Sequence, residues 1–334
     1  MAGPDHWSGR SVLVTGAGGF IGSNLVDQLT RAGADVRAFV RYNSRNDYGC
    51  LELTDPEILS SIEVFTGDLT NPEAVSTAVH DREIVLHLGA LIPIPYSYRH
   101  AREYVAANVV GTLNVLEAVR RSGGVRRLVQ VSSSEVYGTA QTVPIPETHP
   151  LVPQSPYAAS KVAADQLALS YWRSFGAPVV VARPFNTFGP RQSARGVIPT
   201  IITQALTRDV VELGSTSPTR DFLYVEDTAR ALARCGLADG IEGETINFGS
   251  GREISIGDLA DEIIRRIGRK TRVVSTEERT RPPLSEVERL IADTHKAHDL
   301  LGWEPTVAFE DGLQSTIDWL STSLASYKPT IYNV

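Results

Sequence analysis

The chain has 334 residues, a formal net charge of −7 and 42% hydrophobic residues. This composition is typical of a globular protein of more than one domain, and the negative charge argues against a nucleic-acid partner. No apolar run is long enough to span a bilayer, residues 1–10 lack the apolar core of a secretory signal, and the two cysteines and seven histidines show no metal-ligand spacing. We therefore expect a cytoplasmic protein without a membrane partner, a disulfide framework or a metal.

A glycine-rich turn follows the first predicted strand. Residues 11–15 form a short apolar run, and an apolar-periodic helix is expected at about 20–32. Between them, Gly16, Gly19 and Gly22 allow a tight turn and a close approach of the backbone to a pyrophosphate. The helix N-terminus offers that anion free N–H groups and a positive dipole end. This strand–turn–helix context predicts a dinucleotide-binding site.

The second predicted strand, at 35–40, is followed by basic residues. An acid at this place would accept hydrogen bonds from a plain ribose and repel a 2′-phosphate, whereas an arginine does the opposite. Arg41, Ser44 and Arg45 therefore favour NADP over NAD as the cofactor. The alternative interpretation is a solvated loop with two unrelated arginines.

Strand-like and helical segments then alternate, which predicts parallel βαβ units in an α/β, doubly wound Rossmann sheet. Further strands are expected at 63–66, 84–88, 127–132 and 179–183, and further helices at 72–79, 98–121 and 156–175. After Pro184, short strands at 210–212, 222–225, 245–248 and 272–274 mix with helices at 226–238, 257–267, 294–301 and 309–324.

This change of rhythm predicts two units. The dinucleotide-binding domain is expected over 1–184, with returning segments at about 222–246 and 288–302. A smaller α/β C-terminal lobe is expected over 185–221, 247–287 and 303–334. The lobe would bind the substrate and cover a cleft at the carboxyl ends of the strands, where such sheets bind ligands.

Two short blocks carry residues suited to catalysis. Tyr157 and Lys161 are four residues apart, so they project from one face of a helix, and the ammonium is expected to lower a phenol pKa that is normally about 10. Ser133 can hold the oxygen that Tyr157 deprotonates. Glu135, on the same strand face as Ser133 by its two-residue spacing, is placed for a second proton transfer. A structural Glu135 is the alternative.

Ordered matches along nearly the whole chain resemble the extended short-chain dehydrogenases/reductases that act on nucleotide sugars. The matching segments are 15–22, 67–68, 87–90, 108, 111–114, 131–138, 157–161, 183–191, 220–222, 224–227, 247–251 and 301–303. Further segments, 42–44, 62–68, 192–195, 217–222, 285–290 and 331–334, are similar to the 4,6-dehydratases of the legionaminic-acid pathway. The strand ending at 40–41 also resembles that of GDP-mannose 4,6-dehydratases, which use NADP.

The resemblance implies a nucleotide-sugar 4,6-dehydratase that makes a 4-keto-6-deoxy sugar. Tyr157, as phenolate, takes the proton of the sugar 4-hydroxyl, held by Ser133, while hydride passes from C4 to a tightly bound NAD(P). Lys161 lowers the Tyr157 pKa and binds the nicotinamide ribose. Glu135 removes the C5 proton, the 6-hydroxyl leaves as water, and the hydride returns to C6, so that the cofactor is recycled.

The resemblance also implies three sets of site residues. The catalytic set is Ser133, Ser134, Glu135, Tyr157 and Lys161. The cofactor-binding set is Gly16, Gly19, Phe20, Ile21, Gly22, Arg41, Ser44, Asp68, Leu69, Leu88, Ala90, Asn108, Tyr157 and Lys161. The substrate-binding set is Asn186, Arg191, Arg220, Asn247, Arg281 and Arg289. The substrate would be a UDP- or GDP-linked hexose, with an N-acetylglucosamine derivative suggested by the legionaminic-type likeness. The helices at 98–121 and 156–175 would pair across a two-fold axis in a homodimer.

Several residues and the reaction itself allow a second interpretation at this point. Asp68 could cap a helix, Asn108 could hold backbone, and a surface salt bridge is the expected fate of at least one of Arg281 and Arg289. Many dTDP-glucose dehydratases carry an Asp where this chain has Ser134, so either Glu135 or a water would protonate the leaving oxygen. The same block also fits UDP-uronate decarboxylases. A 4-epimerase and a catalytically silent dinucleotide-binding scaffold stay open as well.

Overall fold

Parallel strands form the sheet that organises the chain. The structure, a computed structural model, describes residues 6–327. Within these residues the main sheet has seven strands in the order β11-β6-β5-β4-β1-β2-β3, and each neighbouring pair is parallel. The strands are β1 Ser11–Thr15, β2 Asp35–Arg41, β3 Glu63–Gly67, β4 Ile84–His87, β5 Arg127–Val131, β6 Val179–Pro184 and β11 Thr245–Phe248. This is the Rossmann order, extended by one strand, so the predicted fold class is confirmed.

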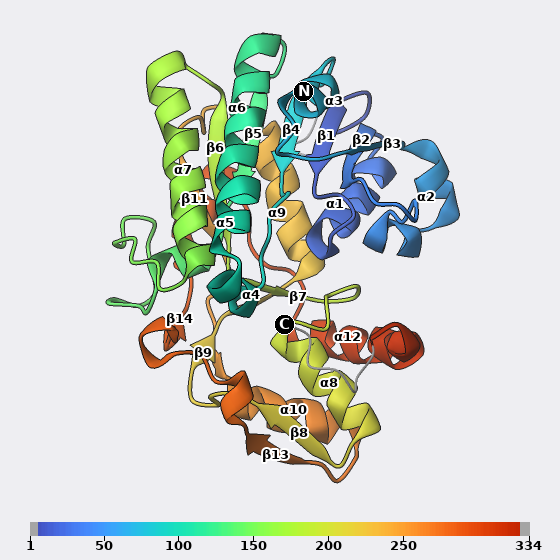
Figure 1. Ribbon diagram of the computed structural model, residues 1–334, viewed down its shortest axis with the longest axis vertical. Helices are drawn as coiled ribbons and strands as arrows, with labels where there is room; N and C mark the ends of the chain where they lie inside the picture. Colours follow the sequence, from blue (N-terminus) through green and yellow to red (C-terminus); the bar gives the residue numbers. More distant parts are fainter. Residues whose placement is uncertain (1–5, 328–334) are drawn as a thin grey trace.

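Helices cover both faces of this sheet (Figure 1). On one face lie α1 Phe20–Arg31, α9 Val225–Leu237 and α11 His295–Leu301, and on the other lie α3 Pro72–Val79, α6 Gly111–Ser122 and α7 Pro156–Phe175. The central strands are Val-rich and buried on both sides, as expected for a covered parallel sheet. Two apolar cores, one on each side, therefore fix the helices to the strands.

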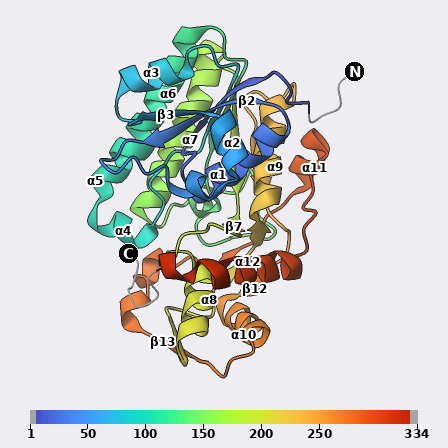
Figure 2. The same ribbon diagram turned by 90° about the vertical axis from the view of Figure 1, so that its right-hand side faces the viewer.

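A smaller lobe packs below the carboxyl ends of the strands (Figure 2). Its own core is formed by α8 Val197–Thr207, α10 Ile256–Ile267 and α12 Phe309–Ser323 around the parallel pair β8 Val210–Leu213 and β13 Arg272–Ser275. Short strands join it to the sheet: β7 Asn186–Phe188, β9 Thr219–Arg220, β10 Phe222–Tyr224, β12 Ile254–Ser255 and β14 Arg289–Leu290. The exact domain boundaries stay a prediction, although β11 continues to residue 248, two residues into the segment assigned to the lobe.

Several short helical segments connect or follow these elements. They are η1 Gly49–Leu53, α2 Pro56–Ser61, η3 Ser134–Tyr137, η4 Glu277–Arg279, η5 Pro283–Ser285 and η6 Leu324–Tyr327. None of the helices in residues 6–327 combines the length and apolarity needed to cross a membrane. The ending 331–334, which contributed to the family resemblance, lies outside the described residues.

The single regular helix expected at 98–121 is wrong, because the chain breaks between two helices at His100 and passes through a π-helical segment at 105–110. The structure has α4 Ile94–Arg99, α5 Ala101–Tyr104, a π-helical segment at Val105–Val110 and then α6. Asn108 lies in the π-helical segment, and its side-chain bonds to the Leu91 backbone are tertiary contacts that helical periodicity does not contain. Helix α8 was not predicted at all, because its apolar residues are buried nearly all round and lack a polar stripe.

One buried carboxylate ties the loop before α12 to the sheet layer. Asp227 of α9 is 0% exposed and accepts hydrogen bonds from the Thr306 and Val307 N–H groups, each at 3.0 Å, and from the Thr306 hydroxyl at 3.0 Å. Arg230 completes the arrangement with an ion pair at 2.6 Å. Four donors thus converge on one carboxylate, so its charge and both oxygens are in use.

Replacing Asp227 by Asn should destabilise the protein by about 3 kcal/mol, because an NH2 group would face donors and leave a cation without its partner. Urea unfolding would measure this. Glu226→Gln, one residue earlier and exposed, is the matched control and should stay within about 0.5 kcal/mol of the wild type. Equal effects of the two substitutions would contradict the assigned role of Asp227.

Candidate active site

The turn from β1 into α1 fits a dinucleotide pyrophosphate. Gly16 has φ +70°, and a Cβ there would lie 2.8 Å from the Gly89 Cα. A Cβ at Gly22 would lie only 2.2 Å from the Gly16 carbonyl oxygen. Gly19 caps α1 without a side chain, so the first N–H groups of the helix remain open to an anion. The turn lies between the carboxyl ends of β1 and β4, where the strand order reverses.

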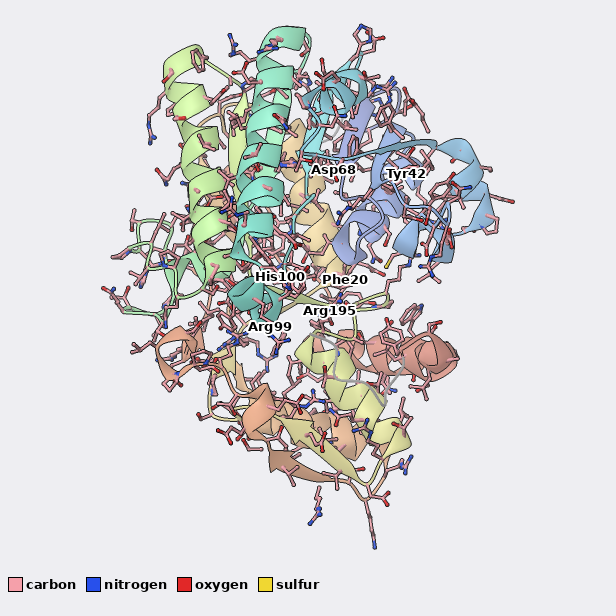
Figure 3. All side chains as sticks on the ribbon, viewed as in Figure 1. Phe20, Tyr42, Asp68, Arg99, His100 and Arg195 are labelled. Carbon is pink, nitrogen blue, oxygen red and sulfur yellow. The ribbon has the colours of Figure 1, made fainter. Side chains whose placement is uncertain are left out.

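The other residues predicted to bind the cofactor surround this turn. Asp68 accepts bonds from the Thr70 hydroxyl and N–H, which lower its pKa, and Arg41 lies 3.7 Å from its Oδ2. Figure 3 shows Asp68 and Tyr42 on the sheet layer and Phe20 nearer the lobe. The other members placed at the rim of the turn or near it are Ser44, which is exposed, and Ile21, Leu69, Leu88 and Ala90, which are half-buried.

Tyr157 and Lys161 occupy the buried face of α7, with exposures of 7% and 4%. Burial raises the pKa of Tyr157 to about 12; a hydrogen bond with Ser133 works in the opposite direction, and the charge of Glu135 adds to the rise. Burial also lowers the pKa of Lys161 to about 8, and its Nζ donates to the Val131 carbonyl at 2.6 Å. Burial thus dominates the pKa of Tyr157 in this structure, and the expected lowering of that pKa by Lys161 stays a prediction.

The two-residue spacing of Ser133 and Glu135 suggested a strand. The structure instead places these residues and Ser134 in a turn. β5 ends at residue 131, and Ser133 caps the 3₁₀ turn η3, with its Oγ accepting from the Glu135 N–H at 3.2 Å. Glu135 is nevertheless 8% exposed and close enough to Tyr157 to affect its titration. Ser134 is 3% exposed. The structure thus brings Ser133, Glu135 and Tyr157 together by a turn rather than by strand alternation.

Two arginines approach Glu135 from the lobe. Arg281 Nη1 lies 3.8 Å from Glu135 Oε1 and 3.8 Å from Glu286 Oε1, and it has no hydrogen-bond partner. Arg220 Nη2 lies 3.4 Å from the same Glu286 oxygen, and Arg220 is 5% exposed. These separations are long for charge-assisted bonds, so two guanidinium groups are gathered here without saturated partners.

Two asparagines from the predicted sets use their side-chain amides in hydrogen bonds within the protein. Asn108 is 1% exposed and bonds the Leu91 N–H and carbonyl and the Ser160 hydroxyl. Asn247 is 0% exposed, accepts from the Tyr137 hydroxyl at 2.7 Å and donates to a backbone carbonyl. The prediction that Asn247 contacts substrate is corrected, because its whole amide is enclosed. Asn108 positions backbone beside the catalytic helix.

The remaining residues predicted to bind substrate, Arg191, Arg289 and Asn186, lie in different parts of the structure. Arg191 pairs with Asp27 of α1 at 2.8 Å, and Arg289 pairs with Glu253 on the lobe. The Arg191 pair differs from the predicted substrate-binding role, whereas the Arg289 pair agrees with the surface salt bridge expected for at least one of Arg281 and Arg289. Asn186 is half-buried at the start of β7, and its buried Oδ1 has no hydrogen-bond partner.

Sequence reasoning missed a buried network behind these residues. Asp165 Oδ2 accepts from the Ser132 hydroxyl at 2.7 Å and from Arg183 Nε and Nη2 at 3.1 and 3.0 Å. Arg183 in turn donates to the Tyr137 hydroxyl at 2.9 Å. The position of Asp165, one helical turn after Lys161, was the available signal. Tyr104 was also missed; it packs edge-on against Tyr157 with ring centroids 6.2 Å apart.

Comparison with known proteins agrees with this geometry. The family model described as GDP-mannose 4,6 dehydratase matches residues 13–316. The chain is 33% identical to the low-salt glycan biosynthesis protein Agl12 of Haloferax volcanii, over 92% of this chain and 97% of that one. It is also 33% identical to a UDP-glucose 4-epimerase of Mycolicibacterium smegmatis, over 92% and 97%. The dTDP-glucose 4,6-dehydratase of Bacillus anthracis, solved in complex with NAD, superposes with a TM-score of 0.84 at 29% identity, covering 96% of this chain and 100% of that one.

Replacing Lys161 by Met tests the burial of its ammonium. The folded-state pKa of Lys161, about 8, lies below the ordinary value of 10.5, so between these values the unfolded chain binds more protons. Wild-type stability should therefore rise with pH across this window, by up to about 1.4 kcal/mol per pH unit from this group. We expect urea unfolding at pH 7.5, 8.5 and 9.5 to show the wild type gaining relative to Lys161→Met.

The exposed Lys270→Met is the control for this titration and should run parallel to the wild type. If Lys161→Met also ran parallel to the wild type, the ammonium would not be held in the low-dielectric environment that the structure describes.

Proposed function

Because this chain belongs to the GDP-mannose 4,6 dehydratase family, within the extended short-chain dehydrogenases/reductases, we propose that it is a nucleotide-sugar 4,6-dehydratase. It would convert a nucleoside-diphosphate hexose to the 4-keto-6-deoxy sugar. The observation that carries this proposal is the Glu135 carboxylate, buried within electrostatic reach of Tyr157. An alcohol oxidation alone, or a 4-epimerisation, needs no second base at this position.

The first half of the reaction is an oxidation at C4. A nicotinamide bound at the Gly16–Gly22 turn would supply the hydride acceptor for C4 and the hydride donor for C6, and its positive charge would favour the Tyr157 phenolate. Tyr157 takes the proton of the 4-hydroxyl, and Ser133, already its hydrogen-bond partner, holds the same oxygen. Lys161 adds positive charge beneath the phenol. The burial that raises the Tyr157 pKa also makes that phenolate a strong base.

The second half is the elimination of water. A ketone at C4 acidifies the C5–H bond, and Glu135 removes that proton. Ser134 is 3% exposed and its hydroxyl is a poor acid, so we assign protonation of the departing 6-hydroxyl to Glu135, which has just acquired a proton. One carboxyl group would thus move a proton from C5 to the leaving oxygen. When the hydride returns to C6, C5 needs one proton, which balances the proton that Tyr157 took from the 4-hydroxyl and would reach C5 through solvent and Glu135. A water relay is the alternative route.

The arginines of the lobe are suited to the diphosphate group of a nucleotide sugar. Arg220 and Arg281 gather two positive charges beside Glu135, and their separations of 3.4 and 3.8 Å from Glu286 leave donors available for a diphosphate. Asn186, with its unpartnered buried oxygen, is proposed as a further sugar or phosphate contact. We keep a UDP- or GDP-linked hexose as the substrate class. A cytoplasmic location is part of the same proposal.

We propose NAD(P) as the cofactor, with a preference for NADP. The glycine turn fits the pyrophosphate, and Arg41, 79% exposed at the end of β2, and Ser44 lie where a 2′-phosphate would be met. Asp68 lies 3.7 Å from Arg41 and partly offsets its charge, which limits the size of the preference.

A homodimer is proposed through the outer face of α6 and α7. These helices pack side by side with α5 (Figure 1). Val105 and Val110, on the π-helical segment that leads into α6, are 52% and 42% exposed, and Trp172 and Phe175 of α7 are 37% and 58% exposed. Exposed apolar positions that follow two adjacent helices are suited to a symmetric helix–helix interface.

The second candidate function is decarboxylation of a UDP-uronate. It is favoured by one observation: the Arg281 guanidinium lies 3.8 Å from Glu135, where it could face a C6 carboxylate. Mass spectrometry after incubation with UDP-, GDP- and dTDP-sugars separates the candidates. Loss of water supports the dehydratase, loss of carbon dioxide the decarboxylase, and a new isomer of unchanged mass the epimerase. No product from any of these sugars would favour the silent scaffold.

Glu135→Gln should abolish water loss and still permit cofactor reduction by the substrate, because the carboxyl group that moves the C5 proton is removed while Ser133 and Tyr157 stay in place. Stopped-flow absorbance at 340 nm would follow the reduction, and mass spectrometry the product; we expect turnover to fall at least 10³-fold, on the order expected for a lost general base. The exposed Glu278→Gln should match the wild type. Wild-type turnover by Glu135→Gln would contradict the assignment.

Arg41→Ala should weaken NADP binding by about tenfold and change NAD binding little, because only NADP carries a 2′-phosphate for this guanidinium. Isothermal titration with both cofactors would measure the two dissociation constants. Arg272→Ala, which removes an exposed arginine on β13 of the lobe, is the matched control. Equal effects of Arg41→Ala on both cofactors would remove the NADP preference and leave NAD(P) binding intact.

A further inference from the structure

A buried carboxylate that the proposed reaction does not use lies directly behind the catalytic pair. Asp165 is on α7, one helical turn beyond Lys161 and two beyond Tyr157, and it is 0% exposed. All its hydrogen bonds, from Ser132 and from Arg183, fall on Oδ2. Its Oδ1 is buried without a partner. A carboxylate held this way is costly to bury, so a purely structural contact could be made at lower cost by apolar groups.

We propose that Asp165 is a positioning residue that keeps the Lys161 ammonium charged beneath the Tyr157 phenol and ties the catalytic helix to the end of β5. This inference rests on the proposed function, because it assigns a role within that reaction. Asp165 touches neither substrate nor cofactor in this assignment. It acts through Lys161, on the same helix, and through Ser132, the residue before the catalytic Ser133.

The charges around Lys161 make Asp165 its counter-ion. From the end of β4, His87 faces Lys161, but burial lowers the His87 pKa to about 3, so that ring is neutral. From β5, the Val131 carbonyl accepts a hydrogen bond from Lys161 Nζ and carries no charge. On α7, Tyr157 is neutral until it reacts. The negative charge that opposes the desolvation of Lys161 is that of Asp165, and it raises the Lys161 pKa.

The groups around Asp165 compensate its negative charge only in part. Arg183 of β6 is its cation, but that guanidinium is shared with the Tyr137 hydroxyl through Nη1. Glu135, the other carboxylate near Tyr157, lies on η3 and faces Arg281 of the lobe. The influence of Asp165 on both Tyr157 and Lys161 therefore persists despite the ion pair. It raises both pKa values, so it sets the pH range in which the pair works.

Asp165→Asn tests this role by removing the charge and keeping the shape. Both Tyr157 and Lys161 would lose a nearby negative charge, so both pKa values should fall. The kcat–pH profile should then move as a whole by about one unit toward lower pH, the size expected for one nearby charge. Ser132→Ala is the matched control: it deletes a hydrogen bond to the same carboxylate but leaves the charge, so its profile should stay in place.

A uniform loss of activity at every pH, with the profile unmoved, would overturn the inference and leave Asp165 a structural residue. Should Asp165→Asn fail to fold, the double variant Asp165→Asn with Arg183→Gln removes both members of the ion pair, so that no guanidinium is left without its carboxylate. A shift in the same direction but smaller is expected from the double variant, since Lys161 has again lost Asp165 and the opposing charge of Arg183 is removed with it.

A readout without catalysis separates this inference from the proposed function. In the Asp165→Asn background, the stability gain contributed by Lys161, measured against Lys161→Met, should begin at lower pH than in the wild-type background. If the wild type turned over no nucleotide sugar and this titration still shifted, the proposed function would fail and the coupling of Asp165 to Lys161 would stand. An unshifted titration in an active enzyme would overturn the coupling alone.

Discussion

Burial of ionisable groups along one face of α7 is the constraint on which the rest of the site depends. Tyr157 and Lys161 are both enclosed, and burial favours the neutral form of each: the pKa of Tyr157 rises to about 12 and that of Lys161 falls to about 8. Taken alone, this environment opposes the phenolate that a C4 oxidation requires. Charge must therefore come from neighbours, and the surrounding elements are arranged to supply it.

The sheet supplies the geometry for those neighbours. β1 and β4 lie side by side where the strand order reverses, and the absence of a Cβ at Gly16 lets its backbone approach that of Gly89 closely. β5, the next strand, ends beside α7 and delivers the Val131 carbonyl to Lys161 and the Ser132 hydroxyl to Asp165. The same strand end leads into η3, which carries Glu135. Backbone topology thus decides which groups meet, before any side chain adjusts.

Sequence patterns predicted what depends on local spacing. The strand–turn–helix around Gly16 and the (i, i+4) pairing of Tyr157 and Lys161 are properties of single elements, and the structure reproduces both. What the patterns did not predict depends on tertiary surroundings. The pKa of Tyr157 is set by how much protein covers it, the enclosure of Asn247 by the loop at Ile145, and the engagement of Arg191 by an acid on α1. No spacing rule contains those distances.

The lobe brings the remaining charge, and its ion pairs around Glu286 and Glu135 are long. Arg220 and Arg281 share Glu286 at 3.4 and 3.8 Å, and Arg281 is equally far from Glu135. In a tight salt bridge these groups would stand closer, and the guanidinium donors would be spent. In the function proposed above, a diphosphate entering this cluster competes with two carboxylates for the same arginines. A contact between Arg281 and the diphosphate would then change the positive charge that faces Glu135. In the proposed function, diphosphate recognition and the basicity of the Glu135 carboxylate therefore depend on the same guanidinium group.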